Sequence, residues 1–244
     1  MSKAFTRPAI RAIIGRGVSF SSDGLISFHG ADFLEDHRFR HAYGAGIARL
    51  RSDPHTEWRV RVAIWAAVQG IKLGGDFVEC GVNTGMMTGA ILEYIRWKDT
   101  CGHRKFYLLD TFEGIPLDGL DPQDLSAVRE RNRQYTDIFD VVEAHFTRYP
   151  NVLLVRGRIP ETLQQVKSEG IAYLSIDMNL ADPEIAAGEF FWPKLLPGGV
   201  IVLDDYNYFG FEKQRHAWNK FAIQRDVDIL PLPTGQGLII KPPM

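Results

Sequence analysis

The chain has 244 residues, of which 45% are hydrophobic and 24% are charged, and its formal net charge is -2. Such a chain is long enough for one α/β domain with an appendage and a sizeable buried core. The small net charge excludes a global field that would attract nucleic acid or an anionic membrane. The sequence also contains no run of about 18 apolar residues, the length of a membrane span. We therefore expect no nucleic acid and no membrane as partners.

The cysteines and the first residues bear on the cellular compartment. Cys80 and Cys101 are too few for a disulfide framework, which fits a reducing, cytoplasmic setting. Residues 1–16 are basic in places but lack the apolar stretch of a signal peptide. Residues 1–55 show no regular periodicity, so we predict an irregular N-terminal arm or lid that precedes a main domain at 56–244.

Hydrophobic periodicity changes at residue 56. Apolar residues at helical spacing predict a helix from Thr56 to Lys72, which Gly74 and Gly75 end. Alternating strands and helices follow, which predicts a parallel sheet with helices on both faces. The residues after 226 predict a closing antiparallel hairpin. We expect strands at 76–80, 105–110, 151–155, 171–176, 199–204, 227–230 and 238–240, and helices at 86–97, 123–147, 160–168, 183–192 and 211–224.

The segment 76–85 is the first strand with the turn that follows it. An apolar run reaches Glu79, and Gly81 and Gly85 lie just beyond. Glycines at such a turn let the backbone approach a nucleotide-like ligand closely. A carboxylate at Glu79 repels phosphate and attracts an ammonium group, so the pattern favours S-adenosylmethionine (SAM) over a dinucleotide. An ordinary α/β turn is the alternative.

Carboxylates end most of the other predicted strands. Asp110 ends the second strand, where it either accepts hydrogen bonds from an adenosyl ribose or caps the next turn. Asp177, Asp204 and Asp205 follow two strands whose ends we expect to be close in space. Hard carboxylate oxygens suit Mg²⁺, although such acids also serve as helix caps. Asn179 is either a further oxygen ligand or a turn residue.

The third strand ends in two arginines around a glycine. Arg156 and Arg158 flank Gly157, and they either line an adenine pocket or pair with nearby acids. The charged run at 118–137 reads as a solvated helix or a mobile lid. We expect residues 1–55 and 114–137 to cover a small-molecule acceptor, with the first segment also supporting a homodimer or larger homo-oligomer.

Four motifs together resemble the macrocin/mycinamicin-type sugar O-methyltransferases over roughly residues 57–242. They are Glu79–Gly85, Leu109–Pro116, Ile176–Asn179 and Leu203–Tyr206. The resemblance implies a Rossmann-like class I SAM-dependent methyltransferase fold, a seven-stranded sheet with its last strand antiparallel. It also implies Mg²⁺ on Asp177, Asp204 and Asp205, and a sugar hydroxyl of a natural product as acceptor. Asn179 departs from the family pattern, which often has an acid there.

These readings assign roles to named residues. Asp177 is the predicted general base and also a metal ligand, with Asp204 and Asp205 as the other ligands. Glu79 is expected to hold the methionine end of SAM and Asp110 its ribose. The predicted cofactor residues are Glu79, Gly81, Asn83, Gly85, Asp110, Thr111, Gly157 and Arg158.

Three other functions compete with methyl transfer. An NAD-dependent oxidoreductase would share the Rossmann fold, but Glu79 before the glycines and the closing hairpin argue against it. A non-catalytic SAM-binding protein would need no metal, so the acids at 177, 204 and 205 argue against it. The same acids would also suit iron in a hydroxylase-like enzyme, which metal analysis would test.

Overall fold

The computed structural model describes residues 17–118, 120, 122–133, 135 and 137–243, so the first sixteen residues of the arm predicted at 1–55 lie outside the described residues. The strands are β1 (Phe20–Ser22), β2 (Leu25–Ser27), β3 (Asp76–Cys80), β4 (Phe106–Asp110), β5 (Val152–Arg156), β6 (Ile171–Ile176), β7 (Leu195–Leu203), β8 (Leu230–Pro231) and β9 (Gly237–Ile240). The helices are α2 (His37–Ile47), α3 (Glu57–Leu73), α4 (Met86–Ile95), α5 (Trp97–Thr100), α6 (Pro122–Asn132), α7 (Phe139–Phe146), α8 (Ala181–Phe191) and α9 (Glu212–Ile223). Single 3-10 turns are η1 (Asp32–Leu34), η2 (Leu163–Gln165) and η3 (Trp192–Lys194).

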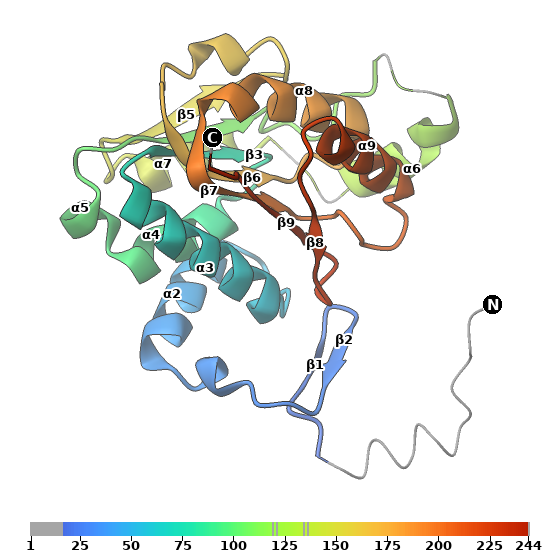
Figure 1. Ribbon diagram of the computed structural model, residues 1–244. Coiled ribbons are helices and arrows are strands. Elements are labelled where there is room, and N and C mark those ends of the chain that lie inside the picture. Colours follow the sequence, from blue (N-terminus) through green and yellow to red (C-terminus); the bar gives the residue numbers. More distant parts are fainter. Residues whose placement is uncertain (1–16, 119, 121, 134, 136, 244) are drawn as a thin grey trace, which may run out of the picture.

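One seven-stranded sheet organises the main domain, in the order β5-β4-β3-β6-β7-β9-β8 (Figure 1). Strands β3 to β7 pair in parallel, whereas β9 is antiparallel to both β7 and β8. The predicted parallel sheet and closing hairpin are therefore confirmed. The strand order reverses between β3 and β6, which places the topological switch point there.

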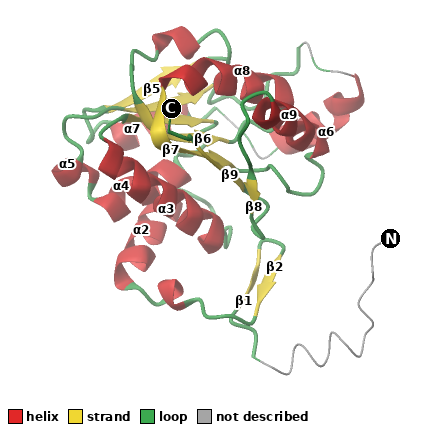
Figure 2. Ribbon diagram, viewed as in Figure 1, coloured by secondary structure: helices red, strands yellow, loops and turns green. Residues whose placement is uncertain are grey.

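Helices cover both faces of this sheet, which divides the buried side chains into two cores (Figure 2). Helices α2, α3, α4 and α7 pack on one face, and α8, α9 and η2 pack on the other. Strand side chains alternate between the faces, so Phe77 joins the first core and Val78 joins the second. Because helices cover both faces of the sheet, strand side chains on either face are buried, which explains why the strands are continuously apolar in the sequence.

The N-terminal segment is more regular than the sequence indicated. Within the predicted irregular region, the described residues contain the β1–β2 hairpin and the eleven-residue helix α2. The Asp36 side chain caps α2 by accepting from the backbone N–H of Arg38. Phe39 and Tyr43 bury in the first core. Helix α2 escaped detection because two of its four buried positions are Ala42 and Gly46, whose small side chains weaken the apolar stripe.

Two predicted helices were wrong in extent. The single helix expected at 123–147 is two helices, α6 and α7. The residues where the helix is interrupted form hydrogen bonds with the loop after β4. Asn132 exchanges hydrogen bonds with the backbone of Ile115, and the backbone N–H of Ile138 donates to Phe112. The helix expected at 160–168 is only the single turn η2. Leu163, which begins this turn, and Val166, which follows it, are both buried and lie three residues apart, the spacing of a 3-10 turn.

No helix in the described part of the chain is both long and apolar enough to cross a membrane.

Gly81 determines how closely the end of β3 approaches the end of β6. Substituting alanine for Gly81 tests this role. A Cβ on Gly81 would lie 1.8 Å from the carbonyl oxygen of Asp177, and the residue has φ +87°. Gly74 has a similar φ of +85° but open space around it. We expect Gly74→Ala to lower the free energy of unfolding by about 1–2 kcal/mol, the cost of left-handed backbone.

Gly81→Ala should lower it by more than about 4 kcal/mol, because two strand ends must separate. Urea denaturation of both variants measures the difference. Equal losses in the two variants would contradict the close approach.

Candidate active site

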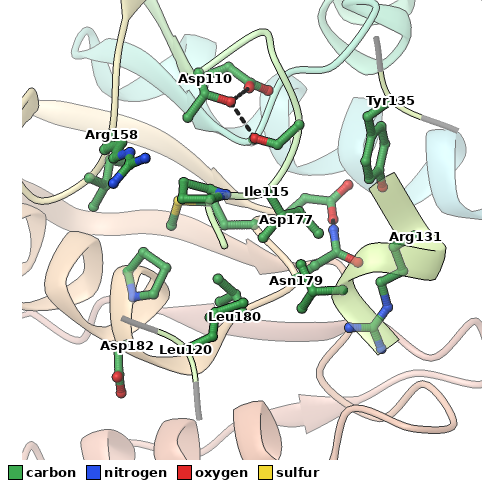
Figure 3. Close-up of a pocket in the computed structure, with 18 of the residues that line it drawn as sticks. Asp110, Ile115, Leu120, Arg131, Tyr135, Arg158, Asp177, Asn179, Leu180 and Asp182 are labelled. Atoms are coloured by element: carbon green, nitrogen blue, oxygen red, sulfur yellow. Dashed lines mark hydrogen bonds between the residues drawn. The ribbon is translucent and has the colours of Figure 1, made fainter. Parts of the chain in front are cut away.

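A cavity of about 760 Å³ lies beyond the carboxyl ends of β3, β4, β5 and β6 (Figure 3). The glycine turn after β3 forms one wall, and residues 177–183 after β6 form another. Residues of α6 and of the loop after β4 close a third side. This position at the switch point is where ligands bind in open α/β sheets. The predicted site residues that line the cavity are Gly81, Asn83, Asp110, Thr111, Gly157, Arg158, Asp177 and Asn179.

Asp110 organises the two turns that meet at this cavity. Its Oδ2 accepts from the backbone N–H groups of Val82 and Asn83 at 2.6 and 2.7 Å. Its Oδ1 accepts from the backbone N–H of Phe112 at 2.8 Å. A carboxylate has about four lone-pair positions, so these bonds leave little capacity for a further partner. The capping role foreseen as the alternative is thus present, and a ribose contact would be added to it.

The other residues of the glycine turn are held by the protein itself. Asn83 has a left-handed backbone conformation, with φ +48°, and it lines the cavity. A Cβ on Gly85 would lie 2.5 Å from the Phe146 ring, and Gly85 does not belong to the described lining. The sequence attributed both glycines to a ligand, but packing against Asp177 and Phe146 already requires them.

Glu79 lies beneath the turn. Its side chain is 3% exposed, it accepts a hydrogen bond from the hydroxyl of Thr88, and it is absent from the described cavity lining. Burial is the main reason that the pKa of Glu79 rises to about 8. A carboxyl group in this state is mostly protonated at neutral pH and is a weak partner for an ammonium group. Direct contact with the methionine end of SAM therefore stays a prediction.

Three carboxylates gather where β6 and β7 end. Asp177 faces the cavity, and its Oδ1 accepts a long hydrogen bond of 3.4 Å from Asn179. Burial, together with the charges of Asp204 and Asp205, holds the pKa of Asp177 well above its ordinary value. Burial and Asp204 likewise raise the pKa of Asp205 to about 6. The predicted convergence of the two strand ends is present, and the three groups repel each other.

Two side chains that the sequence analysis missed contact this cluster. Arg59 of α3 donates to Asp204 and to Asp205, and the amide of Gln236 donates to the remaining oxygen of Asp204 at 2.9 Å. Arg59 falls on the apolar face of α3 together with Ala63 and Ala66, and an arginine in a buried stripe is a signal that could have revealed it. Gln236 had no such signal.

The arginines after β5 take the alternative role that the sequence left open. Arg156 pairs with Glu113 and Arg158 pairs with Asp118. Arg158 still lines the cavity next to Gly157, whose φ is +139°. Thr111 also lines the cavity, and its hydroxyl donates to the carbonyl of Gly114 at 2.6 Å. These residues shape the cavity mouth, and their contact with adenine stays a prediction.

The segment predicted to cover an acceptor does contribute to the cavity. Tyr135 and Arg131 line it near Asp177 and Asn179 (Figure 3). Burial raises the pKa of Tyr135 to about 12, and the nearby carboxylates of Asp177, Asp205 and Asp110 add to this. Arg131 stacks over Phe211, with 4.3 Å from its guanidinium carbon to the ring centre. Neither residue belonged to a recognisable motif.

The fold and the cavity define the class of protein as the Rossmann-like class I methyltransferases. The solved structure of the O-methyltransferase NovP superposes with a TM-score of 0.69, covering 84% of this chain and 98% of that chain at 18% identity.

Residues 59–232 match the model of the macrocin O-methyltransferase (TylF) family, and the chain belongs to that family.

Two curated relatives share about half of the chain. The 8-demethyl-8-(2,3-dimethoxy-alpha-L-rhamnosyl)-tetracenomycin-C 4'-O-methyltransferase of Streptomyces olivaceus is 30% identical over 140 residues, which are 54% of this chain and 53% of the relative. The demethyldecarbamoylnovobiocin O-methyltransferase of Streptomyces niveus is 27% identical over 146 residues, 57% of this chain and 55% of the relative. The chain thus spans about half the length of the curated relatives it matches.

The raised pKa of Glu79 makes stability depend on pH in a defined direction. Because the pKa of about 8 in the folded state lies above the ordinary glutamate value of 4.5, the folded state keeps a proton that the unfolded state releases between these pH values. The free energy of unfolding therefore falls as pH rises through this window, by up to about 1.4 kcal/mol per pH unit. We expect Glu79→Gln to remove this contribution.

Urea denaturation at pH 5, 6.5 and 8 would show a gap between Glu79→Gln and the parent that widens in favour of the variant as pH rises. Glu184, whose pKa is also raised to about 8, keeps its own contribution in both proteins. A gap that is constant with pH would show that Glu79 is ionised in the folded state.

Proposed function

We propose that the protein transfers a methyl group from SAM to a hydroxyl group of a natural-product sugar or a similar small acceptor. The observation that carries the proposal is the cavity, with the glycine turn and Asp110 at one wall and Asp177 at another. Family membership and the activities named for the two curated relatives support the same reaction. A volume of about 760 Å³ is within the range of ligand pockets.

Each ligand has a proposed place in this cavity. The nucleoside end of SAM would lie against Asn83, Asp110 and Thr111, with Gly157 and Arg158 beside the adenine. Gly81 would allow the approach of the methionine end, with Glu79 shaping the turn from below. The acceptor would lie against Tyr135, Arg131 and the residues after β6, which places its hydroxyl near Asp177.

The chain's own residues then have two tasks, which are to position the two reactants and to accept one proton. When bound, SAM supplies an electrophilic methyl on a positive sulfur, and a magnesium ion would supply positive charge that lowers the pKa of the acceptor hydroxyl. Asp177 would accept the proton of that hydroxyl, so that the acceptor oxygen becomes the nucleophile for the methyl group that SAM would supply, with S-adenosylhomocysteine as the leaving product. The walls of the cavity align the two reactants and exclude water, which is the main source of acceleration.

The carboxylate cluster fits a divalent cation by its chemistry. The hard oxygen donors Asp177, Asp204 and Asp205 follow two neighbouring strands, although among the described residues only Asp53, His55 and Glu57 bring three such ligand atoms within 4.8 Å of one another. Asp204 and Asp205 share a single guanidinium, so a divalent cation would add positive charge where carboxylates outnumber cations. We propose that these three residues would hold Mg²⁺, and Asn179 stands close enough to orient an acceptor oxygen.

The cysteines and the N-terminal hairpin bear on the cellular setting and the assembly state. Cys80 and Cys101 are buried and unpaired, as in a reducing cytoplasm. The β1–β2 hairpin exposes Ile26, at 63%, and Phe28, which supports a contact with a second copy of the chain. We propose a homo-oligomer with no nucleic-acid partner.

Asp177→Asn tests the proposed base. Without the carboxylate, the acceptor proton has no positioned acceptor, and general-base catalysis contributes about 10²- to 10⁴-fold. We expect kcat to fall by that factor, while SAM affinity measured by calorimetry changes less than about three-fold because the SAM-facing wall is intact. A variant with normal kcat would remove Asp177 from the mechanism.

An acceptor screen tests the function itself. Glycosides and phenols are incubated with SAM, with and without Mg²⁺, and S-adenosylhomocysteine is measured. We expect product with a glycoside acceptor, and less product after chelation. An amount of product that a chelator does not change would contradict the magnesium proposal but not the methyl-transfer proposal. SAM binding without product for any acceptor would favour a non-catalytic SAM-binding protein. Metal analysis of protein purified without chelator would reveal iron if the acids served a hydroxylase.

A further inference from the structure

Arg59 reaches the carboxylate cluster from a helix on one face of the sheet. Its side chain is 12% exposed, and Asp204 and Asp205 are each 10% exposed. One nitrogen, Nη2, donates to Oδ2 of Asp204 at 2.5 Å, to the Asp204 carbonyl at 2.7 Å and to Oδ1 of Asp205 at 2.8 Å. A single positive nitrogen therefore lies among three oxygens, in the position that a cation shared by the two carboxylates would take.

The second carboxylate oxygen of Asp204, Oδ1, also accepts a hydrogen bond from the protein. Gln236 is fully buried and donates from Nε2 to Oδ1 of Asp204 at 2.9 Å. Thr234 fixes the orientation of that amide by donating to its oxygen at 2.9 Å. Both oxygens of Asp204 are thus bonded to donors of the protein, whereas the Asp177 carboxylate, among the described residues, accepts only the long hydrogen bond from Asn179.

Two segments hold Arg59 from outside the sheet. The Tyr208 ring, from the loop after β7, lies 5.1 Å from its guanidinium carbon. Asp23, at the turn of the β1–β2 hairpin, lies 3.9 Å from Nε, which is buried without a hydrogen-bond partner. The guanidinium is therefore bonded through one nitrogen, and its other contacts are to surface segments.

A guanidinium and a divalent cation exclude each other at these oxygens. Guanidinium carries only donors, so it cannot become a metal ligand. Mg²⁺ requires its oxygen ligands at about 2.0–2.1 Å in near-octahedral order. Arg59 occupies that space, and its charge repels a second cation in a poorly hydrated site.

We propose that Arg59 is the resident cation of the carboxylate cluster, and that a divalent cation binds Asp204 and Asp205 only by displacing it. The proposal rests on the metal site of the proposed function, but concerns the chain's own residue. Arg59 sets how weakly the metal binds, and its displacement releases Asp23 and Tyr208, so that metal binding loosens the hairpin and the loop after β7.

Metal titration tests this without any methyl transfer. Mn²⁺ binding to the full chain is measured by electron paramagnetic resonance of the free ion, for the parent, Arg59→Gln and Arg59→Lys. Glutamine keeps a hydrogen-bond donor without the charge, and lysine keeps the charge. We expect Arg59→Gln to bind Mn²⁺ about ten-fold tighter than the parent or more, and Arg59→Lys to stay near the parent. Equal affinities in parent and Arg59→Gln, or equal gains in Gln and Lys variants, overturn the proposal.

Two controls locate the effect. Arg61→Ala changes the neighbouring arginine of α3, which contacts Tyr94 rather than the acids, and it should leave Mn²⁺ affinity unchanged. Adding Asp205→Asn to Arg59→Gln should abolish the gain. If the gain persists, the ion sits elsewhere, for example at the Asp53–His55–Glu57 group, and the proposal is wrong.

A third measurement remains informative even if Arg59→Gln is unstable. Mg²⁺ should raise the melting temperature of that variant more than that of the parent, because tighter binding to the folded state stabilises it more. An equal or smaller rise contradicts the proposal. SAM affinity of the same proteins is measured separately, so a failed cofactor site is distinguished from a failed role for Arg59.

Discussion

The contact between the ends of β3 and β6 is the constraint on which the site depends. At this switch point, the backbone N–H of Asp177 donates to the carbonyl of Cys80 at 2.8 Å, and Gly81 then passes against the Asp177 carbonyl. No side chain fits between the two strands there. As a result, the turn after β3 and the acid after β6 become adjoining walls of one cavity, although 96 positions of the chain separate Gly81 from Asp177.

Hydrogen bonds to Asp110 extend this constraint to the next strand. The two oxygens of this one carboxylate fix two segments, Oδ2 by accepting from the turn after β3 and Oδ1 by accepting from the loop after β4. Charge-assisted bonds to backbone N–H groups are stronger than neutral ones, which suits a wall that must keep its shape when a ligand leaves. Asp110 thus serves the fold whether or not it also contacts a ribose.

Local patterns predicted what depends on local chemistry. The five parallel strands, helix α3 with Gly74 at its end, and the closing hairpin all follow from periodicity and turn residues, and the structure confirms them. The break between α6 and α7 could not be foreseen, because it depends on Asn132 bonding to Ile115, a contact between segments with no shared pattern. Strand-end acids pointed to the cavity, since parallel strands bring their carboxyl ends to one edge.

The sequence analysis failed where charge compensation is non-local. It proposed that Asp177, Asp204 and Asp205 hold a divalent cation, because such acids repel each other unless a cation or a proton intervenes. A balancing charge in the structure comes from Arg59, which lies 145 positions before Asp204 and belongs to none of the motifs in the sequence. Burial, with the charges of Asp204 and Asp205 added to it, raises the pKa of Asp177, and Arg59 opposes this rise with one positive charge. If the cluster binds a divalent cation as we propose, that cation must compete with Arg59 for Asp204 and Asp205, because both carboxylates already accept from its guanidinium.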